Sequence, residues 1–182
     1  MKVTRTPLPG VLLVEPRVFG DARGFFFESF HQDRYAKSGI EATFVQDNVS
    51  RSARGTLRGL HFQEPTSQGK LVYVTHGSVY DVAVDVRKGS THFGKWFGIE
   101  LNESDHQQIW IPPGFAHGFC VTSETADFAY KCTDYYAPEH ERAIRWNDPQ
   151  LGIAWPVSSP ILSSKDAVAP LLRDAPVLPH VP

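Results

Sequence analysis

Short stretches in which apolar and polar residues alternate recur along most of the chain. From Tyr80 to Val86 every second residue is apolar, and the positions between are polar or small. A period of two is typical of a strand with one buried face. Similar segments, bounded by Gly, Pro, Asn or Asp, predict strands at Val11 to Glu15, Phe25 to Phe30, Thr43 to Val49, Leu57 to Gln63, Lys70 to Thr75, Tyr80 to Val86, Trp96 to Leu101, Gln107 to Ile111, His117 to Thr122 and Asp127 to Thr133.

Helical periodicity is confined to two short segments. One runs from Asp33 to Ser38 and ends at Gly39, and the other runs from Lys165 to Arg173 and is interrupted by Pro170. Many short strands with regular turns predict an all-β fold, a jelly-roll sandwich or barrel with short peripheral helices. Because the chain contains neither a linker nor a repeat, we expect one domain over residues 1–182, with an extended tail over residues 175–182.

Composition narrows the classes of function. The 182 residues are 41% hydrophobic and 21% charged, as in an ordinary globular protein, and the net charge of -2 gives no reason to expect nucleic acid or an anionic membrane as a partner. We expect neither a secretory signal nor a membrane-spanning segment, since no apolar run is long enough. Cys120 and Cys132 lack a metal or redox spacing, which favours reduced thiols in a cytoplasmic protein.

The segment Gly55-Thr-Leu-Arg-Gly-Leu-His-Phe-Gln63 places Arg58 and His61 beside two glycines. A lone histidine on a strand is most often a hydrogen-bonded structural residue. Strict alternation would also put these two side chains on opposite faces of the strand. A bulge at Gly59 would bring both into one pocket, since glycine tolerates the backbone angles of a bulge.

Lys70 is the first residue of one predicted strand, and Tyr130 lies within another. The sequence allows two interpretations of each. Lys70 is either a surface lysine or a cation at the mouth of a pocket. Tyr130 is either an amphipathic wall residue or a catalytic phenol, depending on what faces it.

The segment Pro112-x-Gly-x-x-His117 resembles the second motif of the cupin superfamily, whose jelly rolls are often built around a metal. A metal-binding cupin has a His-x-His pair in its first motif, whereas the matching place here reads His61-Phe62-Gln63. Two imidazoles without a carboxylate rarely hold a transition metal. We therefore expect no metal.

A longer series of motifs, in order along almost the whole chain, resembles the dTDP-4-dehydrorhamnose 3,5-epimerase family. The series comprises Arg23-Gly24, Glu28, Gln46-x-Asn48-x-Ser50, Leu57-Arg-Gly-Leu-His61, Gln68-Gly-Lys70, Val82-Ala-Val-Asp85, Phe115-Ala-His-Gly-Phe119, Tyr130, Asp134-Tyr-Tyr136, Pro138-Glu-x-Glu-Arg142, Arg145-Trp146, Leu151-Gly-Ile-x-Trp-Pro156 and Ser164-Lys-Asp166. The departures are Phe62, where tyrosine is frequent, and Tyr73, where a basic residue is frequent.

The resemblance implies a homodimer of cupin-like jelly rolls that works without a metal or organic cofactor. It implies inversion of C3 and C5 of dTDP-4-dehydro-6-deoxy-D-glucose to give dTDP-4-dehydro-L-rhamnose. By motif, His61 resembles the proton-abstracting base, Asp166 its partner, Tyr130 the proton donor and Lys70 the cation that stabilises the enolate. The residues that resemble substrate contacts are Arg23, Glu28, Gln46, Asn48, Arg58, His117, Glu141 and Lys165.

Elementary chemistry supports these roles. C3 and C5 both flank the C4 ketone, so one set of groups can serve both carbons. A cation aimed at the developing C4 oxyanion contributes about 3–4 kcal/mol in a dry pocket. Inversion needs a base on one face of the ring and a protonated acid on the other, which suits His61 and Tyr130.

Three alternatives remain open on sequence grounds. The first is an epimerase of a related dTDP-4-keto-6-deoxy sugar that acts on C3 or C5 alone. The second is a metal-dependent cupin, which Gln63 disfavours. The third is a sugar-binding cupin without catalysis, which would have no need of both His61 and Tyr130.

Overall fold

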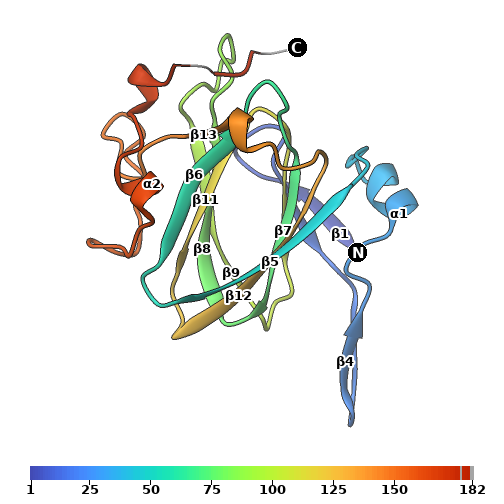
Figure 1. Ribbon diagram of the computed structural model, residues 1–182. Coiled ribbons are helices and arrows are strands. Elements are labelled where there is room, and N and C mark those ends of the chain that lie inside the picture. The colour runs from blue at the N-terminus through green and yellow to red at the C-terminus, as the bar shows by residue number, and fades with distance from the viewer. Residues whose placement is uncertain (177, 181–182) are drawn as a thin grey trace.

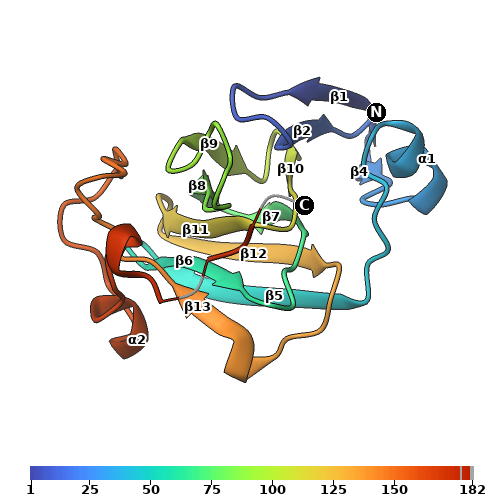
Figure 2. The same ribbon diagram turned by 90° about the horizontal axis from the view of Figure 1, so that it is seen from above.

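The computed structural model describes residues 1–176 and 178–180, and its main feature is a pair of antiparallel sheets that face each other (Figures 1 and 2). The first sheet has the order β1 (Lys2–Arg5), β2 (Leu12–Glu15), β10 (Gln108–Ile111), β7 (Lys70–His76), β12 (Thr125–Cys132) and β5 (Gln46–Ala53). The second has the order β13 (Glu141–Ala143), β6 (Leu57–Gln63), β11 (Phe115–Val121), β8 (Ser78–Asp85) and β9 (Trp96–Asn102). The predicted all-β jelly roll is confirmed.

The main core fills the space between the two sheets. Val72, Val74 and Ile109 from the first sheet pack with Val79 and Ala83 of β8 in the second. Burying these side chains is the dominant favourable contribution to folding, about 25 cal/mol per Å² of apolar surface. The aromatic rings of the second half of the chain complete this core, with Phe119 and Phe128 stacked at 4.0 Å between centroids.

A second hydrophobic cluster lies on the outer face of the five-stranded sheet. Val82 and Val84 of β8 pack there against Ile144, Leu151 and Leu172 of the C-terminal segment. Strand β8 is therefore buried on both faces rather than on one. The polar positions of its alternating pattern, Asp81 among them, point into the barrel and not to solvent.

The C-terminal segment contains only short helices, η1 (Pro138–His140), α2 (Ser164–Ala167) and η2 (Leu172–Asp174), and it runs along the outside of β6 and β8 (Figure 1). The helical turns predicted within Lys165 to Arg173, interrupted at Pro170, are found as α2 before the proline and η2 after it. Helix α2 stops before Pro170, whose ring and missing N–H oppose a continuous helix. Ser163 caps its start by accepting a hydrogen bond from the backbone N–H of Asp166.

A hairpin of β3 (Val18–Asp21) and β4 (Gly24–Phe27) projects away from the barrel (Figure 1). Its strands pair only with each other among the described residues. The predicted strand over Phe25 to Phe30 therefore ends early, and the one predicted from Thr43 begins at Gln46 as β5. The predicted first helix is confirmed as α1 (Gln32–Lys37) within one residue at each end.

Cys120 and Cys132 are buried and unbridged, as expected. No helix in residues 1–176 and 178–180 is long and apolar enough to cross a membrane. Of the predicted extended tail, residues 177, 181 and 182 lie outside the described residues, whereas Pro179 accepts a 2.7 Å hydrogen bond from the backbone of Lys88.

Candidate active site

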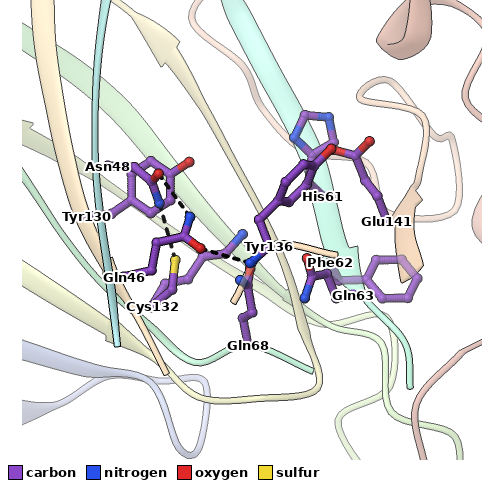
Figure 3. Close-up of a pocket in the computed structure, with 11 residues that line it drawn as sticks. Gln46, Asn48, His61, Phe62, Gln63, Gln68, Tyr130, Cys132, Tyr136 and Glu141 are labelled. Carbon is purple, nitrogen blue, oxygen red and sulfur yellow. Dashed lines mark hydrogen bonds between the residues drawn. The ribbon is translucent and has the colours of Figure 1, made fainter. Parts of the chain in front are cut away.

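Two adjoining cavities lie between the sheets, and three side chains line both of them: His61, Lys70 and Tyr130. The larger has a volume of about 300 Å³ and is also lined by Gln46, Asn48, Phe62, Gln63, Gln68, Cys132, Tyr136 and Glu141 (Figure 3). The smaller has a volume of about 200 Å³ and is also lined by Ser50, Arg58, His117, Phe119, Phe128, Ser163 and Asp166. The shared residues therefore stand where the two cavities meet.

A bulge in β6 turns Arg58 and His61 to the same side. His117 of β11 is opposite His61 and Phe119 is opposite Arg58, so three steps along β6 match two steps along β11. The extra residue falls at Gly59, whose φ of 131° is open to glycine but strained for other residues. A Cβ there would lie 2.5 Å from Cα of Gly118. The hypothesis of a bulge at Gly59 is confirmed.

His61 and Asp166 form a close pair. His61 Nε2 lies 2.6 Å from Asp166 Oδ1, and the Asp166 side chain is only 2% exposed. Burial alone would raise the pKa of Asp166, but hydrogen bonds from His61, Ser163 and the Gly59 backbone outweigh it and lower that pKa. The carboxylate is thus ionised at neutral pH and accepts the Nε2–H, which leaves Nδ1 of His61 as the free base nitrogen.

Tyr130 and Lys70 face this pair from the other sheet, on neighbouring strands β12 and β7. Burial, helped by the Cys132 thiol, raises the pKa of Tyr130, so the phenol is protonated at neutral pH. Burial lowers the pKa of Lys70, although Cys132, Asp81 and Glu141 partly oppose the effect. In Figure 3, His61 and Tyr130 stand on opposite sides of the cavity. The barrel thus places an imidazole on one wall and a protonated phenol with a nearby lysine amine on the other.

His117 makes a second buried pair that sequence reasoning only half identified. Its Nε2 lies 2.8 Å from Oδ2 of Asp81, and both side chains are buried. Asp81 Oδ1 has no hydrogen-bond partner among the described residues. The sequence did not predict this role of Asp81, because the alternating pattern around it indicates a polar side chain that faces solvent.

Gln46 and Asn48 lie on the inner face of β5, as their shared parity predicts. Gln46 Nε2 donates to Asn48 Oδ1 at 3.0 Å, and Gln46 Oε1 accepts from the backbone N–H of Tyr136 at 2.8 Å. Tyr136 also lines the larger cavity but was not singled out from the sequence. The sequence shows only that Tyr136 belongs to a motif with several aromatic residues, and no periodic pattern there indicates which side chains face a cavity.

Glu141 and Arg58 complete the polar lining. Arg58 donates from Nε and Nη2 to Ser52 Oγ and borders the smaller cavity. Glu141 borders the larger cavity and accepts a 2.6 Å hydrogen bond from Lys165 Nζ. Lys165 is mostly exposed, so it lies at the rim, where its interaction with Glu141 raises its pKa.

Of the predicted substrate contacts, Arg23, Glu28 and Lys165 line neither cavity, and of these three Lys165 alone bonds to a lining residue, Glu141. Arg23 is 90% exposed on the projecting hairpin and binds Asp21, while Glu28 accepts a 2.8 Å hydrogen bond from Arg34. Both lie on or beside the hairpin, which points away from their own barrel (Figure 1).

The donor groups do not suit a metal ion. Within residues 1–176 and 178–180, no three His, Cys, Asp or Glu side chains gather as a ligand set. The amide of Gln63, at the place of a cupin ligand, is occupied by hydrogen bonds to Thr66, Tyr135 and Ala137. That catalysis needs no metal remains a prediction.

A cupin-like jelly-roll barrel that holds a histidine–aspartate pair opposite a tyrosine and a lysine has the groups that an isomerase working by acid–base chemistry needs. The family model for dTDP-4-dehydrorhamnose 3,5-epimerase matches residues 5–174, and the chain belongs to that family.

Similar proteins agree with this assignment. The dTDP-4-dehydrorhamnose 3,5-epimerase of Pseudomonas aeruginosa is 57% identical over 98% of this chain and 100% of its own length. That of Salmonella typhimurium is 54% identical over 96% of this chain and 97% of its own length. The crystal structure of dTDP-6-deoxy-D-glucose-3,5-epimerase from Legionella pneumophila in complex with dTDP-4-keto-L-rhamnose has a TM-score of 0.96 at 53% identity, covering 100% of this chain and 98% of the other.

Proposed function

We propose that this protein inverts C3 and C5 of dTDP-4-dehydro-6-deoxy-D-glucose to give dTDP-4-dehydro-L-rhamnose, a step of dTDP-L-rhamnose biosynthesis. The observation that carries the proposal is the arrangement of His61 and Tyr130, which line shared cavities from opposite sheets of one barrel. Family membership supplies the substrate class.

His61 acts as the base. Its Nδ1 takes the proton from C3 or C5, and the electron pair of the broken C–H bond moves into an enolate with its charge on the C4 oxygen. Asp166 holds the ring in the tautomer that leaves Nδ1 free and stabilises the imidazolium formed. The Lys70 ammonium stabilises the C4 oxyanion.

Tyr130 acts as the acid. It returns a proton to the same carbon from the opposite face of the ring, which completes the inversion and leaves a phenolate to be reprotonated. A phenol whose pKa is raised by burial starts in the required protonated form. The cycle transfers protons only, so no net oxidation or reduction occurs and we expect no cofactor.

The remaining polar residues bind the parts of the substrate that do not react. Arg58 offers a forked, permanently charged donor for the pyrophosphate, and the amides of Gln46 and Asn48 suit the edge of a pyrimidine. His117, Glu141 and Lys165 provide further contacts around the sugar and at the rim.

We infer in addition that the protein is a homodimer of single-domain subunits in the cytoplasm. The hairpin exposes 64% of Phe25 and 69% of Phe26, an apolar surface of the kind that marks an interface. In this arrangement Arg23 and Glu28 of one subunit contact the substrate in the cavity of the other. Two unbridged thiols accord with a reducing compartment.

The function is tested by incubating the protein with dTDP-4-dehydro-6-deoxy-D-glucose in D₂O, with a 4-keto reductase to trap the product, and following the ring protons by NMR. The proposal requires deuterium at both C3 and C5 and an L-rhamnose product after reduction. Deuterium at one carbon only would identify a mono-epimerase, and no exchange would refute acid–base catalysis. Activity that survives exhaustive dialysis against EDTA supports the absence of a metal.

A further inference from the structure

Gln63 lies two residues beyond His61 on β6 and also lines the larger cavity, but the residue is only 4% exposed and both ends of its amide are hydrogen-bonded. Nε2 donates to the backbone oxygens of Thr66 at 2.9 Å and Tyr135 at 3.2 Å, with Thr66 Oγ1 at 3.2 Å, and Oε1 accepts from the N–H of Ala137 at 2.9 Å. Because the donors and acceptors are matched at both ends, the amide has one orientation.

These hydrogen bonds join the strand that carries the base to the segment of residues 134–137. That segment contributes Tyr136 to the wall of the larger cavity. Two other glutamines hold the same segment: Gln68 donates to the Asp134 oxygen at 2.8 Å, and Gln46 accepts from the Tyr136 N–H at 2.8 Å. Figure 3 shows the three glutamine side chains around Tyr136.

Gln63 differs from the other two glutamines in its burial and in the number of its bonds. Gln46 and Gln68 are half-buried and each makes one bond to the segment, whereas the buried Gln63 makes two. The segment has no regular secondary structure, so its ordering depends on such side-chain bonds. A buried amide that satisfies two backbone groups also cannot be removed without leaving them unpaired.

We propose that Gln63 is a positioning residue: it fixes the wall formed by residues 134–137 at a set place relative to His61 before substrate arrives. The inference rests on the proposed function. The groups assigned to proton transfer, His61, Lys70 and Tyr130, do not lie on this segment, so we assign the wall to substrate binding. If the wall is already ordered before binding, substrate binding does not lose the conformational entropy of ordering it, and the affinity is higher.

This role predicts a particular kinetic effect. An interaction that helps ground state and transition state equally changes KM and leaves kcat unchanged. Replacing Gln63 with methionine removes the donor and the acceptor at similar volume. We expect KM to rise about tenfold, which corresponds to about 1.4 kcal/mol, while kcat stays within about twofold.

Gln108 provides a matched control. It is a fully buried glutamine that donates to the Ser29 oxygen at 2.8 Å and accepts from the Tyr35 hydroxyl at 2.8 Å, and it lines neither cavity. Gln108→Met therefore loses a comparable amide in the same fold. We expect it to lower the melting temperature like Gln63→Met but to leave KM unchanged.

The experiment measures kcat, KM and melting temperature for the wild type, Gln63→Met and Gln108→Met, together with the affinity for dTDP by calorimetry. Gln63→Glu is the second variant if Gln63→Met does not fold, since its carboxylate keeps the Ala137 contact but repels two carbonyl oxygens. A tenfold loss restricted to Gln63 variants supports the role.

Two results would overturn the inference: an unchanged KM and dTDP affinity in the Gln63 variants, or an equal rise in Gln108→Met. A fall in kcat without a rise in KM would do the same. If the proposed function is wrong, the wild type will show no turnover. The affinities for dTDP would still show in that case whether the Gln63 variants disturb the wall of residues 134–137.

Discussion

His61 and Asp166 are separated by 105 positions in the chain, yet Nε2 of the one lies 2.6 Å from Oδ1 of the other. A bulge at Gly59 turns the imidazole into the barrel, and a capped single-turn helix brings the carboxylate to it. The contact assigns the two ring nitrogens different roles, since the carboxylate accepts from Nε2 and Nδ1 is left as the unprotonated nitrogen.

The pair should behave as one catalytic unit. We expect His61→Asn to lower the rate by roughly 10²–10⁴, the range of general base catalysis, and Asp166→Asn to lower it by a smaller factor. The double variant should be no slower than His61→Asn alone, because Asp166 acts only through the imidazole. Steady-state rates of the three variants check this. Multiplicative losses would mean that Asp166 has a separate role.

Tyr130→Phe should separate exchange from inversion. Without the phenol, His61 can still remove a proton and return a deuteron to the same face, so NMR in D₂O should show label with the original configuration. The ring of phenylalanine keeps the packing against Phe128, whose centroid lies 6.0 Å away. If exchange and inversion fall by the same factor, Tyr130 is not the second proton carrier.

The alkaline side of the pH profile should report Lys70. Burial lowers the pKa of its ammonium, and the ammonium is the form that stabilises the enolate. As pH rises through the lowered value, kcat/KM should fall at a pH below the ordinary lysine value of about 10.4. Lys70→Met should lose roughly 10²–10³ in kcat and also lose this descent. An unchanged profile in Lys70→Met would assign the descent to another group.

The hairpin should control both assembly and activity. Phe25→Ser with Phe26→Ser removes its exposed apolar surface, so we expect a monomer by analytical ultracentrifugation and a large loss of kcat/KM, since Arg23 no longer reaches a second cavity. Val168→Ser, which alters an apolar residue that is also exposed but lies on the C-terminal segment, should remain dimeric and active. A fully active monomeric hairpin variant would remove the shared-site arrangement.

The strands were predictable because local alternation and turn residues determine them. The assignment of faces was less predictable. In β8, Val82 and Val84 looked like the core face, but they pack under an irregular C-terminal segment whose pairing has no period, while Asp81 enters the barrel. Strands β1, β3 and β13 were not predicted because each has only three or four residues, too few to recognise an alternating pattern.

In the candidate site, too, local sequence predicts some features, whereas others depend on contacts between distant parts of the chain. Local reasoning at Gly59 was enough to predict that Arg58 and His61 share a face. No local pattern connects Asp166 to His61, and only the family resemblance did so. Gln63 was interpreted as a lost metal ligand, whereas its hydrogen bonds to Tyr135 and Ala137 depend on loops distant in sequence.

Asp85 should stabilise the fold at a place remote from the active site. The fully buried Asp85 carboxylate accepts hydrogen bonds from Arg87 Nη2 at 2.7 Å and Ser90 Oγ at 2.6 Å. Burial alone would raise the pKa of Asp85, but these bonds outweigh it and lower that pKa. The ionised carboxylate therefore adds to the free energy of unfolding at pH values above about 3.9, the pKa of an aspartate in the unfolded chain. This stabilisation is lost as the pH falls through the lower pKa that Asp85 has in the folded protein.

Asp85→Asn should cost about 3 kcal/mol at pH 7, because it leaves the partly buried Arg87 without its counter-ion. The difference from wild type should shrink below about pH 4, where the wild-type carboxylate must also take up a proton. Urea unfolding at pH 7 and at acid pH measures both values, with Asp33→Asn, an exposed carboxylate, as the control. A difference that is constant over this range would show that the charge of Asp85 does not contribute and that only the shape of its side chain matters.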